Sequence, residues 1–316
     1  MPKVSVIIPI YGVEKYIERC ARSLFEQTLD DIEYLFVDDC TPDKSIEILE
    51  RIIDEYQPRL AAERKVVRIE RMPTNSGLPA VRRHGIQLCT GDYVIHCDSD
   101  DWVSETMYKE LYDYAVCEKS DLVFCDYFVT HENEENCNIF KKCLTSLTRE
   151  YIIRCLLTSS ALNPVWTLFA KRSLYKDFVM PIGSQTEDKV IAVQLVWKSV
   201  CTTYYPHPLY FYRQTPGSIT NRVDKESLLR RYNQSKDNIN IIIDYLTKEG
   251  VSTYFEDEID ALKVSLDKYL YKRMTDGRFR KNFKQIKLPF KVVMTNKYLT
   301  VRDKIIYLYM TLMTII

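Results

Sequence analysis

Short apolar runs and amphipathic stretches alternate along the first hundred residues of the chain. The apolar runs are rich in β-branched residues and predict strands buried on both faces, because a strand covered by helices on each side needs apolar residues at nearly every position. The stretches between them carry apolar residues about every 3.6 positions and predict helices. The four predicted strands are 4–8, 33–37, 66–69 and 92–97. This alternation predicts an α/β fold with a mostly parallel sheet and helices on both faces.

Beyond residue 103 the pattern is less regular. The predicted helices are 107–118, 148–157, 188–200, 228–246 and 254–274. The predicted strands are 121–125, 202–205 and 208–213, the last two bounded by prolines, and 131–142 is predicted to be a loop. From Asp224 onward all signals are helical, so we expect a helical extension after the α/β part.

The composition of the chain is that of a globular protein. Its 316 residues are 46% hydrophobic with only 8 Gly and 12 Pro, which excludes collagen-like and disordered chains. The net charge is 44 − 44 = 0, which argues against a nucleic-acid binder. The ten cysteines form no Cys-x-x-Cys pair and indicate free thiols. No apolar run reaches about 18 residues and the start does not resemble a signal peptide, so we expect a cytoplasmic protein.

Acidic residues cluster directly after two of the predicted strands. Asp38 and Asp39 follow the second strand, and Asp98, Asp100 and Asp101 follow the fourth. Ligands of parallel α/β sheets bind at the carboxyl ends of the strands. Clustered carboxylates repel one another, and a hard ion such as Mg²⁺ or Mn²⁺ offsets that repulsion. The alternative is a solvated turn whose aspartates cap the next helix.

The absence of certain sequence motifs argues against several classes of nucleotide-binding and phosphoryl-transfer proteins. The chain has neither G-x-G-x-x-G after its first strand nor a G-x-x-x-x-G-K-[ST] sequence, which argues against dinucleotide dehydrogenases and P-loop NTPases. Phosphoryl-transfer proteins with an aspartyl nucleophile need that aspartate after the first strand, where this chain has Pro9-Ile10-Tyr11. Tyr11 either provides an aromatic ring on which a base stacks or is an ordinary packing residue.

Five separate segments, in this order and spacing, resemble the inverting family-2 glycosyltransferases with the Rossmann-like GT-A fold. They are 4–11 (VSVIIPIY), 37–43 (VDDCTPD), 75–77 (NSG) with Arg82, 91–93 (GDY) and 98–101 (DSDD). The similarity continues through Trp166, Lys171, 186–188 (TED), 212–213 (YR) and 218–220 (SIT), and it covers about residues 3–222. The later segments look like the bacterial subgroup that builds capsular, O-antigen or exopolysaccharide chains.

The resemblance implies a nucleotide-sugar site at the strand ends. Pro9 and Tyr11 would border the nucleobase, and Asp39 would accept a hydrogen bond from the uracil N–H. Arg82 would lie near the nucleotide, although an ordinary helix-surface arginine is an equal alternative.

The acidic segment after the fourth strand would hold the metal in this family. Asp98 and Asp100, with Ser99 between them, would form the Asp-x-Asp motif that contacts the ribose and holds Mn²⁺ or Mg²⁺ against the diphosphate. Asp101 is the alternative principal ligand.

The resemblance also implies the catalytic and acceptor-side residues. Asp188 resembles the general base that takes the proton from the acceptor hydroxyl, with Glu187 in support, and seen alone this pair is an ordinary charge pair at a helix start. Trp102 would be a wall of the sugar pocket or a packed aromatic residue, and Arg213 an acceptor-side or supporting residue.

The activity implied is transfer of a sugar, with inversion, from a nucleotide-diphospho-sugar to a hydroxyl of a glycan or lipid-linked glycan. A UDP-sugar is the preferred donor. Residues 1–103 would bind the nucleotide-sugar and 104–222 the acceptor. The alternative is a catalytically inactive relative that binds nucleotide or glycan as a partner subunit.

The extension, 223–316, is basic near its end. Between residues 278 and 304 nine Lys or Arg are opposed by Asp303 alone, and the apolar segment 305–316 follows. Such a segment suits the anionic inner face of a cell membrane, where a lipid-linked acceptor would lie. The alternative is a helix that packs on the core and leaves its basic face in water. Twelve residues are too few to span a bilayer as a helix.

Overall fold

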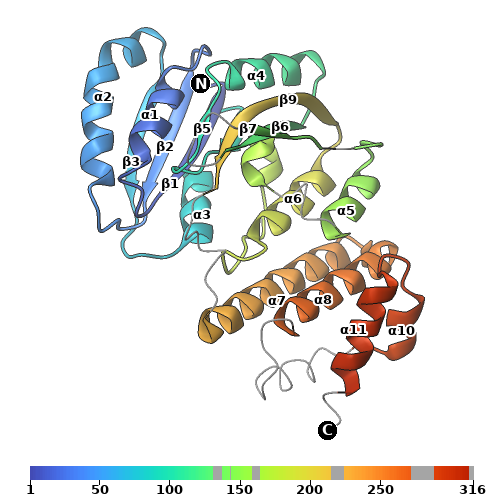
Figure 1. Cartoon of the computed structure of the whole chain (residues 1–316). Coiled ribbons are helices and arrows are strands. Elements are labelled where there is room, and N and C mark those ends of the chain that lie inside the picture. The colour runs from blue at the N-terminus through green and yellow to red at the C-terminus, as the bar shows by residue number, and fades with distance from the viewer. Residues whose placement is uncertain (131–136, 143, 159–163, 215–223, 272–287, 313–316) are drawn as a thin grey trace.

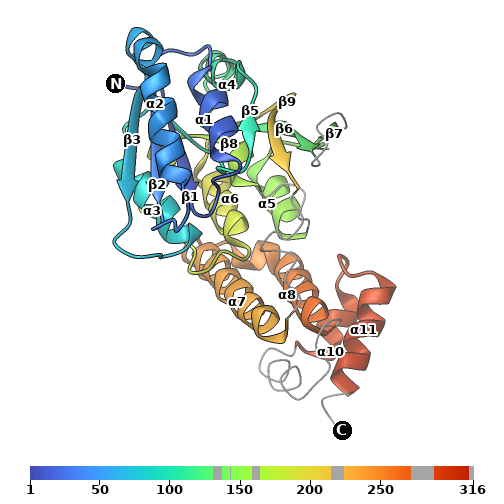
Figure 2. The ribbon, with the colours of Figure 1, turned by 60° about the vertical axis from the view of Figure 1, so that its left-hand side comes forward.

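The chain folds into an α/β part followed by a helical part (Figure 1). The computed structural model describes residues 1–130, 137–142, 144–158, 164–214, 224–271 and 288–312. One sheet with helices on both faces occupies the first part, and the helices after residue 224 extend away from it at one end of the molecule (Figures 1 and 2).

Four parallel strands form the first half of the sheet, in the order β3-β2-β1-β4. They are β1 (Val4–Ile10), β2 (Ile32–Asp38), β3 (Val66–Arg71) and β4 (Tyr93–His96). Every residue of β2 and β4 is buried, as the apolar runs predict. All four predicted strands are confirmed, with ends that differ by at most two residues.

Helices cover both faces of these strands. Helices α1 (Ile17–Phe25) and α2 (Ser45–Ala62) lie on one face, and α3 (Leu78–Leu88) lies on the other. Helix α3 approaches β1 closely because Gly85 has no side chain: a Cβ atom there would lie 2.4 Å from Cγ2 of Ile7. The close contact holds α3 firmly against the sheet.

The second half of the sheet mixes strand directions. Strand β8 (Leu168–Lys171) lies antiparallel between β4 and β6 (Leu122–Thr130), β9 (Thr202–Arg213) runs parallel to β6, and the short β5 (Trp102–Val103) and β7 (Cys137–Phe140) pair antiparallel with β9 and β6. The helices of this half are α4 (Met107–Cys117), α5 (Arg149–Thr158) and α6 (Glu187–Lys198). Short 3₁₀ turns cover Val165–Thr167, Arg172–Tyr175 and Ser252–Phe255.

The structure corrects two predictions of this half and adds one strand. The two strands predicted at 202–205 and 208–213 are one strand, β9, whose prolines are accommodated where its register with β6 shifts on either side of Asp126. In the predicted loop 131–142, residues 137–140 form β7; residues 131–136 lie outside the described part. Strand β8 was not predicted, since its four residues are too short for a periodic signal.

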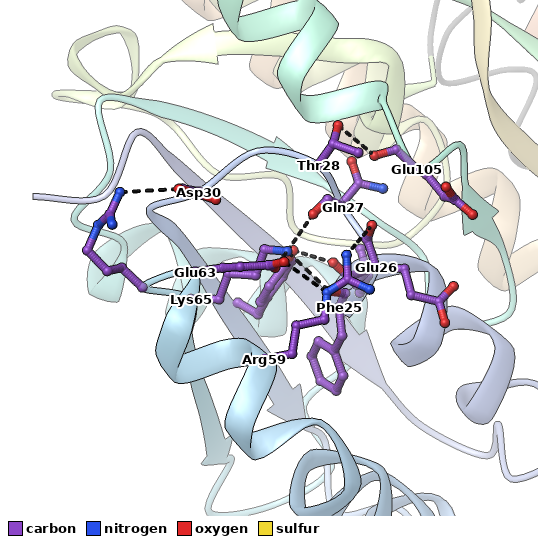
Figure 3. Close-up of polar contacts among 12 residues, drawn as sticks. Phe25, Glu26, Gln27, Thr28, Asp30, Arg59, Glu63, Lys65 and Glu105 are labelled. Atoms are coloured by element: carbon purple, nitrogen blue, oxygen red, sulfur yellow. Dashed lines mark hydrogen bonds and ion pairs between the residues drawn. The ribbon is translucent and has the colours of Figure 1, made fainter.

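A buried lysine ties the end of α1 to the start of β3 (Figure 3). Lys65 is 5% exposed, and its ammonium group donates to the carbonyl oxygens of Phe25 at 3.1 Å and Gln27 at 2.5 Å and to the carboxylate of Glu63. The carbonyls at the end of a helix have no partner within it, so the lysine completes their hydrogen bonding.

We expect Lys65→Met to lower the free energy of unfolding by about 1–3 kcal/mol, because it leaves buried carbonyl groups without a donor. The midpoint of urea unfolding measures this effect. Lys15→Met, at an exposed position near the start of α1, is the matched control and should change the midpoint little. Equal midpoints for the two variants would contradict the prediction.

The extension consists of four described helices. They are α7 (Lys225–Lys248), α8 (Glu256–Tyr271), α10 (Phe290–Thr295) and α11 (Val301–Leu312). Asp224 caps α7, since its Oδ1 accepts a hydrogen bond from the Ser227 N–H at 2.8 Å. Helices α7 and α8 share a core with α5 and α6, and α10 and α11 pack on α8 at the tip. None of the described helices is both long and apolar enough to cross a membrane.

Candidate active site

Arg82 of α3 joins three acidic side chains that are far apart in the sequence. Its Nη1 donates to Oε1 of Glu187 at 2.6 Å and to Oδ1 of Asp188 at 2.9 Å, and its Nη2 donates to Oδ1 of Asp98 at 2.7 Å. Arg82 is 2% exposed. This burial rules out the alternative of an ordinary surface arginine. The three ion pairs of Arg82 join the end of β4 to the start of α6.

The single positive charge of Arg82 does not offset the burial of the carboxylates around it. Burial raises the pKa of Glu187 to about 8 and that of Asp188 to about 6, even though the Arg82 charge opposes both shifts. Asp188 is the more accessible of the two, with 34% of its side chain exposed against 5% for Glu187. A carboxylate with a raised pKa and access to solvent is suited to accept a proton near neutral pH.

The cluster faces a cavity of about 860 Å³ between the sheet and the extension. Arg82, Asp98, Glu187 and Asp188 line one side of it. Residues of α8, of α11 and of the segment between α10 and α11 also line it, namely Ala261, Leu262, Ser265, Lys268, Tyr298, Leu299 and Asp303. The predicted acceptor half, 104–222, therefore does not enclose this cavity alone, because the extension forms one of its walls.

Strand β9 holds the acidic segment after β4 in place. The hydroxyl of Tyr210 accepts from the Asp98 N–H at 3.0 Å and donates to Oδ2 of Asp101 at 2.7 Å. Oδ1 of Asp101 accepts from the Arg213 N–H at 2.7 Å, and Arg213 Nε donates to the Asp100 carbonyl at 3.2 Å. Asp101 is 1% exposed with both carboxylate oxygens engaged by the protein, so its geometry is that of a residue that positions the loop.

Asp98 and Asp100 are the other two acidic side chains of this segment. Burial and the neighbouring Asp98 charge raise the pKa of Asp100 to about 6, so a cation would stabilise its ionised form. The described residues contain no cluster of three or more acidic, His or Cys side chains that could hold an ion by themselves. Two carboxylates suit Mg²⁺ or Mn²⁺ when diphosphate oxygens and waters supply the other ligands.

The predicted nucleotide-binding residues lie around the ends of β1 and β2. Tyr11 is 53% exposed and free to stack on a base. Oδ1 and Oδ2 of Asp39 accept from the N–H groups of Ser76 at 2.7 Å and Gly77 at 2.8 Å. Gly77 has φ +82°, which explains the glycine in this turn. Asp39 thus shapes the turn that leads into α3.

Two further residues of this region have clear structural contacts. The Ser99 hydroxyl donates to the carbonyl oxygen of Pro9 at 2.5 Å and joins the ends of β1 and β4. Trp102 is 7% exposed, stacks on Phe211 with ring centroids 5.2 Å apart, and carries the Arg19 guanidinium 3.5 Å over its ring. Trp102 lines a smaller cavity of about 380 Å³ beside α1.

Aromatic residues pack beneath the site; the resemblance included Trp166 and Tyr212, whereas Tyr210 had been given no role. Trp166 stacks on Tyr210 and Tyr212, with ring centroids 4.1 and 5.6 Å apart. Tyr212 also lines the cavity. The sequence contained one signal for this packing, the spacing of Tyr210 and Tyr212, because residues two apart on a strand point to the same face of the sheet.

Comparisons with known proteins give the family of this chain. The family described as glycosyl transferase family 2 matches residues 5–178, more than half of the chain. The chain is 30% identical over 233 residues to the uncharacterized glycosyltransferase EpsJ of Bacillus subtilis, which covers 70% of this chain and 63% of that protein. It is 29% identical over 232 residues to the putative glycosyltransferase EpsH of the same organism, covering 71% and 64%. The chain thus spans less than two thirds of the length of these relatives.

Solved structures show the same fold. The chain matches residues 1–349 of S. aureus TarS in complex with UDP-GlcNAc with a TM-score of 0.61 and 16% identity, covering 99% of this chain and 88% of that one. A mannosyltransferase from Pyrobaculum calidifontis, in complex with GDP-Man and Mn²⁺, matches with a TM-score of 0.55 and 13% identity, covering 99% and 86%. The architecture is thus the GT-A fold, and the chain belongs to glycosyl transferase family 2.

Proposed function

We propose that this protein transfers a sugar from a nucleotide-diphospho-sugar, with a UDP-sugar as the preferred donor, to a hydroxyl of a glycan or lipid-linked glycan in the synthesis of surface polysaccharide. The observation that carries the proposal is the Arg82 cluster, which brings Asp98 and Asp188 to one side of an open cavity. Membership of the family, the UDP-GlcNAc bound to TarS, and a related poly(ribitol-phosphate) beta-glucosyltransferase of Bacillus spizizenii support it.

Asp188 is the proposed general base of an inverting, single displacement. The acceptor oxygen forms a bond to the anomeric carbon while the bond from that carbon to the diphosphate oxygen breaks, and the electron pair leaves with the diphosphate. The acceptor proton passes to the Asp188 carboxylate. The start of α6 and the Arg82 guanidinium both favour the ionised form of Asp188 before the reaction.

Asp98 and Asp100 are the proposed metal ligands. A bound Mn²⁺ or Mg²⁺ would neutralise charge on the departing nucleoside diphosphate. Asp101, Ser99 and Arg213 are proposed to position this segment, and Glu187 to hold Arg82 between the two ends of the cluster. Pro9, Tyr11 and Asp39 are the proposed contacts of the nucleobase.

We expect Asp100→Ala to abolish metal-dependent release of nucleoside diphosphate from the donor. The assay uses purified full-length protein with a panel of UDP-, GDP- and dTDP-sugars, with Mn²⁺ or with a chelator. Loss of one of two carboxylate ligands should reduce the rate by roughly 10²-fold or more. Asp113→Asn, exposed on α4, is the control. Absence of both turnover and metal-dependent nucleotide binding in the unaltered protein would overturn the proposal, and binding without turnover would favour an inactive relative.

A further inference from the structure

Helix α11 exposes an apolar stripe along its whole length. The exposed residues are Val301, Ile305, Leu308, Tyr309 and Leu312, with exposed fractions of 39 to 74%. At about 100° per residue they fall within an arc of about 100° on one side of the helix. Single exposed apolar residues are common on protein surfaces, but a continuous stripe of this kind marks an interaction site.

The fold of the extension does not need this stripe. Tyr307 and Met310, on the other side of α11, are 1% and 0% exposed and pack in a core with Leu270 of α8 and Val293 of α10. The helix therefore has two apolar faces, of which one holds it to the protein and the other is left in water. Figures 1 and 2 place α10 and α11 at the tip of the molecule.

Basic residues border the stripe on both sides. Arg302 and Lys304 lie at the two edges of the arc on the helical wheel of α11. Lys291 of α10 is exposed, and its neighbour in the sequence, Phe290, is 54% exposed. Asp303, the acidic residue of α11, lies on the inner side and pairs with Lys268 of α8. The outer face thus combines apolar and cationic groups without an acidic one from α11.

We propose that α10 and α11 form a docking face for an anionic lipid bilayer, with the stripe lying in the boundary between headgroups and acyl chains and Arg302 and Lys291 at the headgroups. This is the chemistry of an interfacial amphipathic helix. A second copy of the chain fits the face less well, because a symmetric contact would bring the cationic rims of both copies together.

The docking face and the cavity share one segment of chain. Asp303, on the inner side of α11, and Tyr298 and Leu299 just before it line the 860 Å³ cavity. Docking would therefore hold one wall of the cavity close to the bilayer. Given the proposed function, on which this last step rests, the acceptor is a lipid-linked glycan whose hydroxyl enters the cavity from the membrane side.

Co-sedimentation with lipid vesicles tests the docking face. Full-length protein is mixed with phosphatidylcholine vesicles, with and without phosphatidylglycerol at roughly one third of the lipid. We expect binding to the anionic vesicles only and its loss at high salt. The double variant Ile305→Ser/Leu308→Ser should lower the partition coefficient roughly tenfold or more, and Lys291→Gln/Arg302→Gln should lower it by a similar factor. Val200→Ser, at a 95% exposed valine outside α10 and α11, is the matched control and should bind as the unaltered protein does.

Each other outcome overturns the proposal. These outcomes are no binding to anionic vesicles, equal binding to both kinds of vesicle, or full binding by the Ile305→Ser/Leu308→Ser variant. A dimer of the unaltered protein that this variant converts to a monomer would assign the face to a second copy. Ile305 and Leu308 are exposed, so we expect their replacement to leave the fold intact, and circular dichroism checks this. Donor turnover in solution is measured on the same samples, so a failure of the proposed function appears there and not in the vesicle assay.

Discussion

Replacement of Asp188 by asparagine is expected to lower donor turnover by roughly 10²–10⁴-fold, the usual contribution of a general base. Asparagine keeps the size of the side chain and an oxygen for the 2.9 Å hydrogen bond from Arg82, but it cannot accept a proton at neutral pH. Release of nucleoside diphosphate measures the turnover. Calorimetry of UDP binding with Mn²⁺ measures the donor pocket separately, and we expect it to be nearly unchanged.

The dependence of the rate on pH provides a second test of the same residue. Burial raises the pKa of Asp188 to about 6. Because the base must be ionised, turnover should be constant above that pH and fall about tenfold per pH unit below it. Asp188→Asn should lose this dependence, whereas Asp237→Asn, exposed on α7, should keep both the rate and the profile. A rate for Asp188→Asn above about a tenth of the unaltered rate would assign the base to another residue.

Replacement of Arg82 by methionine is expected to lower the free energy of unfolding by about 3–5 kcal/mol, because it leaves three buried or half-buried carboxylates without their common counter-charge. It should also abolish donor turnover, since Asp98 and Asp188 lose the group that holds them on one side of the cavity. Urea unfolding measures the first effect and release of nucleoside diphosphate the second.

The loss of stability in Arg82→Met should grow with pH. The folded-state pKa values of Glu187 and Asp188 already lie above their ordinary values, so the folded protein binds more protons than the unfolded chain and stability falls as pH rises. Without Arg82 both pKa values should rise further, so the difference from the unaltered protein should be larger near pH 8 than near pH 5. Arg83→Met, exposed on the same helix, is the control. If the two variants were equally stable, the cluster would not depend on Arg82.

The predicted site follows from local patterns as far as the strand ends are concerned. The apolar runs of β1, β2 and β4 predict where each strand stops, and the aspartates that follow them lie at one edge of the sheet in the structure. Such runs are readable because a doubly covered strand needs apolar residues at every position. Strand β8 was missed because its four residues are too few to give a periodic signal.

The assignments within the acidic segment needed the tertiary structure. Adjacent aspartates look alike in a sequence, but Asp101 is turned inward to Tyr210 and the Arg213 N–H, more than a hundred residues away. Trp102 is packed between Arg19 and Phe211, two contacts that no local pattern predicts. The sequence left two interpretations of the extension open, a segment at the membrane face and a helix packed on the core. In α11 Tyr307 packs inside, whereas Ile305 stays exposed.

Periodicity and short segments of neighbouring residues were enough to predict the α/β class, the family and the strand ends at which the candidate chemistry lies. The burial of Arg82 among Asp98, Glu187 and Asp188, and the part of the cavity wall that the extension forms, are visible only in the folded structure. The contacts of Arg82 join side chains separated by sixteen to more than a hundred positions, and the cavity wall comes from residues still further along the chain. Such contacts depend on how helices and strands pack, which no local pattern encodes.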